Sequence, residues 1–166
     1  MRVFVEFSYF EYMTHPSFLS ELEEGEVIPL VRLYVVERSR APRCVAKCRG
    51  KKLLYTFRLD EFKDYVVFEK VKELVEKCGR KVNEHSPLTP NISWRIQNVK
   101  HVVYEVSRET LEKIEKVIAF RKVIDEVVST YNRAIIFRGD SERMREVAKH
   151  YAKLVEKMIN RVLGSC

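Results

Sequence analysis

The stretch that decides the fold is VIPLVRLYVVER, residues 27–38. Apolar Val31, Leu33 and Val35 occupy every second position, the spacing that places side chains on one face of an extended strand. The other face carries the polar and aromatic members, which are Arg32, Tyr34 and Arg38. We therefore expect a long strand with one buried face and one face that carries charge.

Further strands are expected on both sides of this one. Residues 2–9 form an apolar, aromatic run of strand length. Residues 44–48 and 53–59 alternate in the same way and flank a turn at residues 49–51, which contains glycine. The sequence therefore predicts a β-hairpin in the segment that follows the long strand.

Apolar residues at helical spacing predict a helix over residues 61–78. Asp60 is the expected N-cap, because its carboxylate can accept from the free N–H groups of the first turn. Gly79 is the expected stop. A shorter helix is expected within residues 14–25, where a proline occupies the first turn.

The second half of the chain is expected to be mainly helical. Residues 83–90 are interpreted as a loop and an internal boundary, and residues 92–97 and 100–106 as a short strand pair. Two long amphipathic helices then follow over residues 107–163, with Ser107 as the cap of the first.

Together these elements predict an α+β fold in a single domain, residues 1–166. An antiparallel sheet is expected from the sheet-rich part, residues 1–80, packed by one helix. A long helical hairpin is expected over residues 107–163. An apolar stripe on that hairpin that the sheet leaves uncovered would form a homodimer interface.

Composition limits the class of protein. The longest apolar runs are shorter than the roughly 18 residues that span a bilayer, so we expect no membrane partner and a cytoplasmic location. Charged residues make up 33% of the chain and Gln97 is its single glutamine. This profile is typical of hyperthermophilic, including archaeal, proteins.

The positive charge of the chain is concentrated in one segment. The chain has 31 lysines and arginines, 24 aspartates and glutamates, and a formal net charge of +7. Between residues 38 and 58 there is no acidic residue, but there are eight basic ones: Arg38, Arg40, Arg43, Lys47, Arg49, Lys51, Lys52 and Arg58. A concentrated basic patch attracts a polyanion, because it neutralises neighbouring phosphates together and releases their counterions.

The leading hypothesis is therefore a protein that binds RNA or single-stranded DNA through a basic β-hairpin, without catalysis and without a cofactor. Tyr34 would offer a ring for base stacking among the phosphate contacts. The candidate binding residues are Arg32, Tyr34, Arg38, Arg40, Arg43, Lys47, Arg49, Lys51, Lys52 and Arg58. An alternative is an interaction or assembly factor that uses the helical hairpin, with the basic segment docked on an acidic protein partner.

The four cysteines are Cys44, Cys48, Cys78 and Cys166. The first three, with His15 or His85 as a fourth ligand, would make up a zinc set. The spacing of three residues between Cys44 and Cys48 departs from the usual two-residue knuckle, and Cys78 lies on an apolar helix stripe. We therefore predict no metal site. Free thiols are expected, with a disulfide that involves Cys44 or Cys48 as the alternative.

A second alternative is enzymatic. Arg145 and His150 flank four residues on the last predicted helix, a spacing that resembles the Arg-x4–6-His motif of HEPN ribonucleases. This resemblance implies a metal-independent ribonuclease in which a dimer pairs two such motifs, with Arg145 and His150 as the catalytic pair. HEPN domains are all-helical, whereas the first part of this chain predicts strands. No catalytic residue is therefore assigned in the leading hypothesis.

Overall fold

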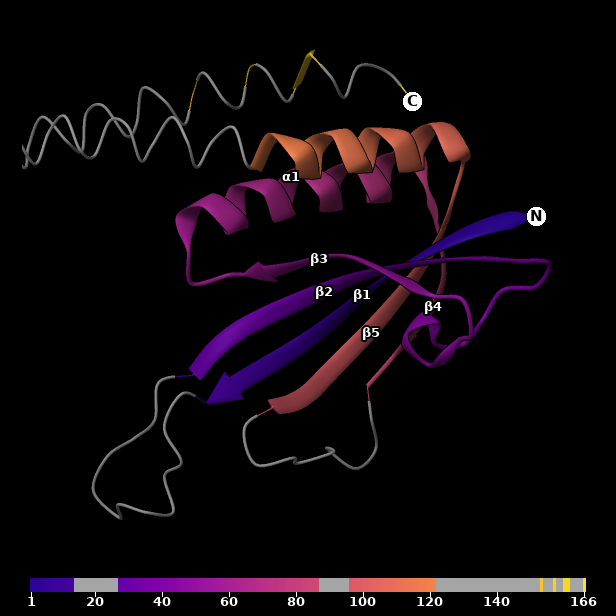
Figure 1. Cartoon of the computed structure of the whole chain (residues 1–166), viewed down its shortest axis with the longest axis horizontal. Coiled ribbons are helices and arrows are strands. Elements are labelled where there is room, and N and C mark those ends of the chain that lie inside the picture. Colours follow the sequence, from indigo (N-terminus) through magenta and orange to yellow (C-terminus); the bar gives the residue numbers. More distant parts are fainter. Residues whose placement is uncertain (14–26, 87–95, 122–152, 154–156, 158–159, 162–165) are drawn as a thin grey trace, which may run out of the picture.

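The computed structural model describes residues 1–13, 27–86 and 96–121, together with positions 153, 157, 160, 161 and 166. Within this part, five strands form an antiparallel sheet in the order β3-β2-β1-β5-β4 (Figure 1). The strands are β1 (Arg2–Met13), β2 (Val27–Arg38), β3 (Lys52–Arg58), β4 (Arg80–His85) and β5 (Ile96–Val106). Helix α1 (Phe62–Cys78) packs on this sheet. The predicted α+β class is therefore confirmed.

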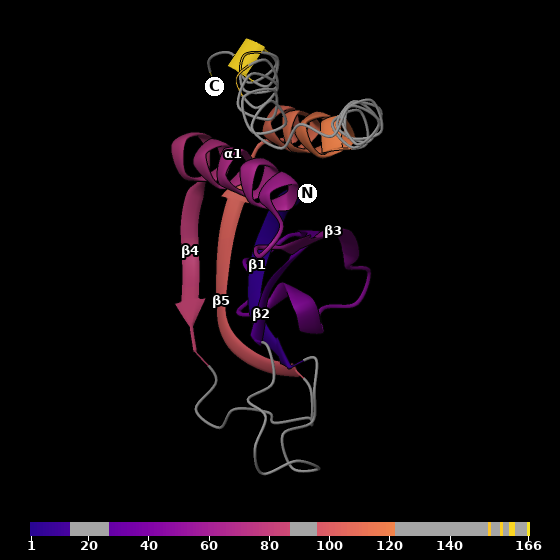
Figure 2. The ribbon, with the colours of Figure 1, turned by 90° about the vertical axis from the view of Figure 1, so that its left-hand side faces the viewer.

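One face of the sheet, the helix-covered face, packs against α1 and the helical residues 108–121. Figure 2 shows these two helices next to one another on the same side of the sheet. The alternation seen in the sequence places every second side chain of β1 and β2 on this face. The core includes Val5, Phe7, Val31, Leu33, Phe57, Val67, Val71, Val102, Ile114 and Val117. It follows that α1 and residues 108–121 are held by one continuous apolar layer.

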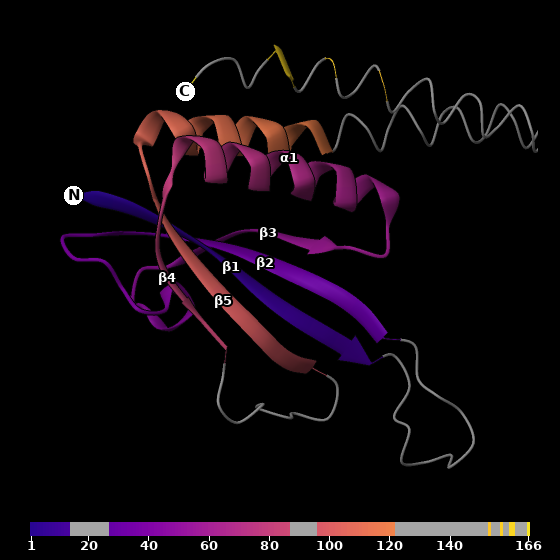
Figure 3. The same cartoon turned by 180° about the vertical axis from the view of Figure 1, so that it is seen from behind.

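The opposite face, the loop-covered face, is crossed by residues 39–51, which we call the basic loop. The loop contains the 3-10 helix η1 (Val45–Lys47). Figure 3, from behind, shows η1 on the side of the sheet away from α1. Val45 of the loop packs in a small apolar cluster with Phe4, Val36 and Val103 of the strands beneath it. The long β2–β3 connection is thus a packed layer of its own.

Helix α1 ends where the sequence predicted, but its N-cap is a different residue. The N-cap is Glu61, and its side chain makes no capping hydrogen bond. The carboxylate of Asp60 instead binds the guanidinium of Arg58 at 2.9 Å, so the prediction that Asp60 caps the helix was wrong. Gly79 ends the helix as predicted. A Cβ at Gly79 would lie 2.6 Å from the carbonyl oxygen of Val75, so close approach of backbone explains the glycine there.

Three further predictions need correction. Residues 44–48 are not a strand, and β3 pairs with β2 rather than with them. Residues 80–85 form β4, where a loop starting at residue 83 was expected. Residues 96–106 form one continuous strand, β5, in place of a strand pair. The sheet therefore extends well beyond residues 1–80.

The first C-terminal helix begins as predicted, because the Oγ of Ser107 accepts from the backbone N–H of Thr110 at 3.1 Å. A buried ion pair holds this helix to α1, with Arg121 Nε 2.6 Å from Asp64 Oδ1. The predicted second helix of the hairpin, with Arg145 and His150, lies outside the described residues apart from a few isolated positions. The short helix expected within residues 14–25 also lies outside them.

A disulfide joins Cys78, at the end of α1, to Cys166. The expectation of a free thiol at Cys78 was therefore wrong. The alternative of a disulfide at Cys44 or Cys48 was wrong as well, because both are free thiols. Among the helices that the structure describes, none has the length and apolar character needed to cross a membrane.

Candidate functional site

A buried carboxylate holds the basic loop over the sheet. Glu6 lies in the middle of β1 on the loop-covered face and is fully buried. Its Oε1 accepts from the backbone N–H of Val45 at 2.8 Å, and its Oε2 accepts from that of Ala46 at 3.2 Å. These N–H groups lie at the start of η1, where a negative charge is favoured. A strand residue thus caps a helical turn that is distant in sequence.

The same carboxylate also contacts the side chains of Ser8 and His101. The Ser8 hydroxyl donates to Glu6 Oε2 at 2.5 Å, and His101 Nδ1 lies 3.4 Å from that oxygen. Burial raises the pKa of Glu6, but the hydrogen bonds from His101, Ser8 and the Val45 N–H outweigh burial and lower the pKa overall. Glu6 is therefore ionised at neutral pH, which strengthens its hold on the loop.

Contacts at several other points fix the path of the basic loop. Val45 is fully buried in the small apolar cluster on the loop-covered face. The amide of Asn83, on β4, donates to the carbonyl oxygen of Arg43 at 2.6 Å. Lys51 donates to the carbonyl oxygen of Ala46, and its ammonium lies 5.7 Å from the ring centroid of Tyr34. The loop backbone is therefore held to β1, β2 and β4.

The outer surface of the loop carries cations. Five exposed basic side chains on the loop or directly after it make no ion pair with any residue in the described parts of the chain: Arg40, Arg43, Lys47, Arg49 and Lys52. Elsewhere on the surface, Arg2 and Arg80 both bind Glu105, and Arg108 binds Glu37 at 2.7 Å. The basic loop is thus a surface whose charge is not neutralised within the described protein.

The other predicted binding residues lie apart from this set or are already engaged. Arg58 is at the far end of β3 and binds Asp60 and Glu61, and the Asp60 hydrogen bond raises its pKa. The guanidinium of Arg32 lies over the ring of Phe10, and that of Arg38 donates to Cys48 Sγ at 3.2 Å. Two more, Tyr34 and Lys51, contact one another.

No family model, curated protein or solved structure matches this chain. A function therefore has to be inferred from its own residues and their geometry.

A second group of side chains meets beside Glu6. Cys44 from the basic loop, His85 from β4 and His101 from β5 each offer a ligand atom, and these atoms lie within 4.8 Å of one another. Burial raises the pKa of the Cys44 thiol, and the nearby Glu6 charge adds to the effect. Burial, with the charge of His101 and of Arg43, lowers the pKa of His85.

This cluster corrects the cysteine interpretation in part. The structure places Cys44 close to His85, as the zinc hypothesis supposed. The other two cysteines of that hypothesis are engaged elsewhere, because Cys78 is in the disulfide and the Cys48 thiol donates to the carbonyl oxygen of Cys44. His101 was missed, since nothing in its local sequence marks it. Its pairing opposite His85 across β4 and β5 supplies the contact.

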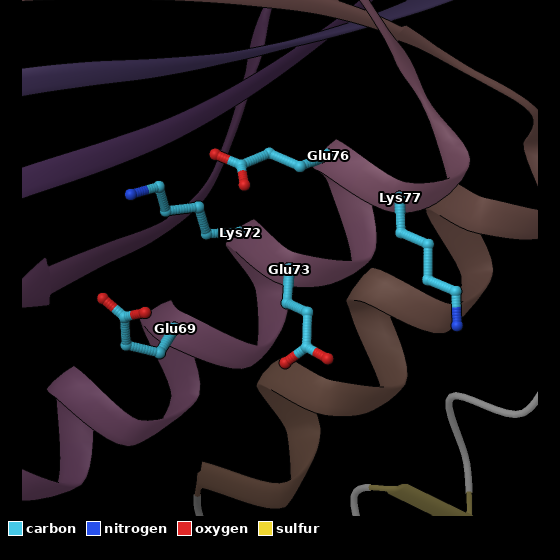
Figure 4. A pocket seen from close by; sticks show the side chains of 5 residues that line it. All are labelled: Glu69, Lys72, Glu73, Glu76 and Lys77. Carbon is cyan, nitrogen blue, oxygen red and sulfur yellow. The ribbon is translucent and has the colours of Figure 1, made fainter.

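A hollow also lies along the outer side of α1, lined by Glu69, Lys72, Glu73, Glu76 and Lys77. Figure 4 shows that these side chains spread outward from the helix and do not converge on one point. Three carboxylates and two ammonium groups are mixed there, so this surface attracts neither anions nor cations strongly. The basic loop differs from it, because its exposed charges are all of one sign.

Proposed function

We propose that this protein binds RNA or single-stranded DNA through the basic loop, without catalysing a reaction. The observation that carries the proposal is the group of exposed, unpaired cations within the described part of the chain, on a loop whose backbone is anchored from below. Phosphate groups along a nucleic-acid strand supply the matching negative charges, and their neutralisation releases condensed counterions.

The fixed backbone of the basic loop favours binding, in addition to the charge of the loop. Glu6 holds the amide groups of η1, and Val45 holds the loop on the sheet. Cations on a loop whose backbone is already ordered lose less conformational freedom on binding than cations on a disordered segment. Arg43, Lys47 and Arg49 are therefore the residues that we expect to contact phosphates first.

The expected contacts are to the backbone of the nucleic acid. Tyr34 is half-buried, packs against the apolar cluster and lies under Lys51, so its ring is engaged within the protein. Base stacking on Tyr34 accordingly does not support the proposal. Cation–phosphate contacts position a strand but carry no sequence information. Binding should thus depend strongly on salt and weakly on sequence.

The test is a salt titration of oligonucleotide binding, followed by fluorescence anisotropy with labelled single-stranded RNA and DNA of mixed sequence. A triple variant that combines Arg43→Ala, Lys47→Ala and Arg49→Ala removes three loop cations. The matched control removes three cations on the helical side: Lys72→Ala, Lys77→Ala and Lys116→Ala. Both variants change the net charge equally, so only the position of the charge differs.

The loop variant should flatten the slope of log K against log salt by about 0.7 for each lost contact, or roughly 2 in all. The control should keep the slope of the unmodified protein. Equal slopes in the two variants would remove the basic loop from the interface. Absence of binding to either oligonucleotide at low salt would overturn the proposed function.

A further inference from the structure

The polar cluster beneath the basic loop has the composition of a metal site. Cys44 Sγ lies 4.0 Å from His101 Nδ1. The imidazole rings of His85 and His101 stack with centroids 4.9 Å apart and planes 22° apart. The three side chains come from the loop, β4 and β5, so they are brought together by the fold and not by sequence proximity.

The chemistry of these donors narrows the ligand. One thiolate and two imidazole nitrogens are ligands that Zn²⁺ and similar divalent transition metals prefer, whereas Ca²⁺ and Mg²⁺ require oxygen. Zinc bonds of about 2.0–2.3 Å place tetrahedral ligand atoms roughly 3.3–3.7 Å apart. The ligand atoms here lie within 4.8 Å of one another. Rotation of the side chains, including one imidazole ring, would bring them to the spacing of a zinc site.

The surroundings also suit a metal. Ser8 Oγ and Glu6 Oε2 lie 3.1 and 3.4 Å from His101 Nδ1. Metal binding through the other ring nitrogen, Nε2, would leave the Nδ1–H of His101 to donate to this carboxylate, the usual outer partner of a metal-binding histidine. The side chain of His101 is buried. Asn83 Nδ2 lies 3.4 Å from His85 Nδ1 on the other side of the cluster.

We propose that Cys44, His85 and His101 bind one divalent transition metal ion of the zinc class, which links the basic loop to β4 and β5. Three protein ligands leave a fourth position, which water would fill. The inference does not depend on nucleic-acid binding, because it rests on the cluster alone.

The experiment treats the full-length chain with EDTA, removes the chelator, and titrates the protein with Zn²⁺ by calorimetry and with Co²⁺ by absorption. One equivalent should bind, and Co²⁺ should give a thiolate-to-metal charge-transfer band. Cys44→Ser should abolish that band and weaken Zn²⁺ binding at least about 100-fold, beyond the effect of losing an outer partner. Cys48→Ser is the matched control, because it removes a thiol of the same loop outside the cluster.

His101 is buried, and its replacement can unfold the protein. His85→Ala provides the second arm, since His85 is half-buried on an edge strand. It should weaken Zn²⁺ binding while circular dichroism stays unchanged. Zinc should also raise the Tm of the unmodified protein and of Cys48→Ser, but not that of Cys44→Ser. Failure to bind a stoichiometric equivalent, or equal affinity in Cys44→Ser and Cys48→Ser, would overturn the proposal.

Discussion

The two faces of the sheet are built differently, although both are covered. The helix-covered face is apolar throughout its centre, with Val5, Phe7 and Leu33 under α1 and residues 108–121. On the loop-covered face the same strand β1 presents Glu6 and Ser8, both fully buried. An apolar layer needs only complementary shape, whereas a buried carboxylate needs a full set of hydrogen-bond partners.

This difference suggests a division of roles. The helix-covered face supplies most of the apolar burial and therefore most of the stability. The loop-covered face uses buried polar groups to fix one loop, and that loop carries exposed cations that have no ion pair within the described residues. Buried polar networks specify one arrangement when all members have partners. We infer that the second face has been shaped by the position of the loop as well as by stability.

The largest expected effect lies on the helix-covered face. Phe7 is buried and packs edge-to-face with Phe68 and Tyr104, at centroid distances of 5.9 and 6.0 Å. Phe7→Ala should lower the free energy of unfolding by about 3–5 kcal/mol, since it leaves a cavity in the core. Urea denaturation measures this. Phe10→Ala, at a half-buried position of the same strand, should lower the free energy of unfolding clearly less. An equal loss in the two variants would contradict the role given to the helix-covered face.

A smaller effect is expected on the loop-covered face. Val45→Ala removes two buried methyl groups and should cost about 2 kcal/mol. It should also speed hydrogen exchange at the amides of Val45 and Ala46, because the loop loses its apolar hold. Val99→Ala is the control, since Val99 is 40% exposed. Unchanged exchange in Val45→Ala would show that Glu6 alone fixes the loop.

The smallest effect concerns the surface ion pairs. Hydrogen bonds from Arg2 and Arg80 lower the pKa of Glu105 to about 2. A carboxyl group whose pKa is lower in the folded than in the unfolded protein stabilises the fold at pH values above its unfolded pKa, here near 4.5. That stabilisation is lost as the pH falls toward 2. Glu105→Gln should therefore have a slightly lower Tm than the unmodified protein at pH 7 and an equal Tm near pH 2. Solvent screening keeps the gap small. A gap that widens in acid would contradict this.

Local patterns predicted the elements of the helix-covered face well. The alternation in residues 27–38 matches β2, and helical spacing matches α1 within a residue. Both patterns arise because one side of each element is buried against the same core. Ser107 was also predicted as a cap, since capping depends only on residues of the helix itself.

The loop-covered face was predicted poorly, because long-range contacts decide it. The segment around Cys44–Cys48 alternates like a strand, yet Glu6 captures the amides of Val45 and Ala46 and turns it into η1. Strand β4 has the sequence RKVNEH, whose polar residues suit an edge strand and resemble a loop. The charge segregation was visible in the sequence; the anchor beneath it was not.

The central claim is that the loop is held in place for binding, and Glu6→Gln tests it most directly. The substitution keeps the volume but removes a negative charge beneath the cations, so electrostatics alone predicts tighter binding. Our account predicts weaker binding, because Gln satisfies the two loop amides less well. The measurement is the Kd for a labelled single-stranded oligonucleotide at low salt with EDTA, on protein shown to be folded by circular dichroism. A loss of about fivefold, equivalent to roughly 1 kcal/mol, is expected; equal or tighter binding would contradict the account.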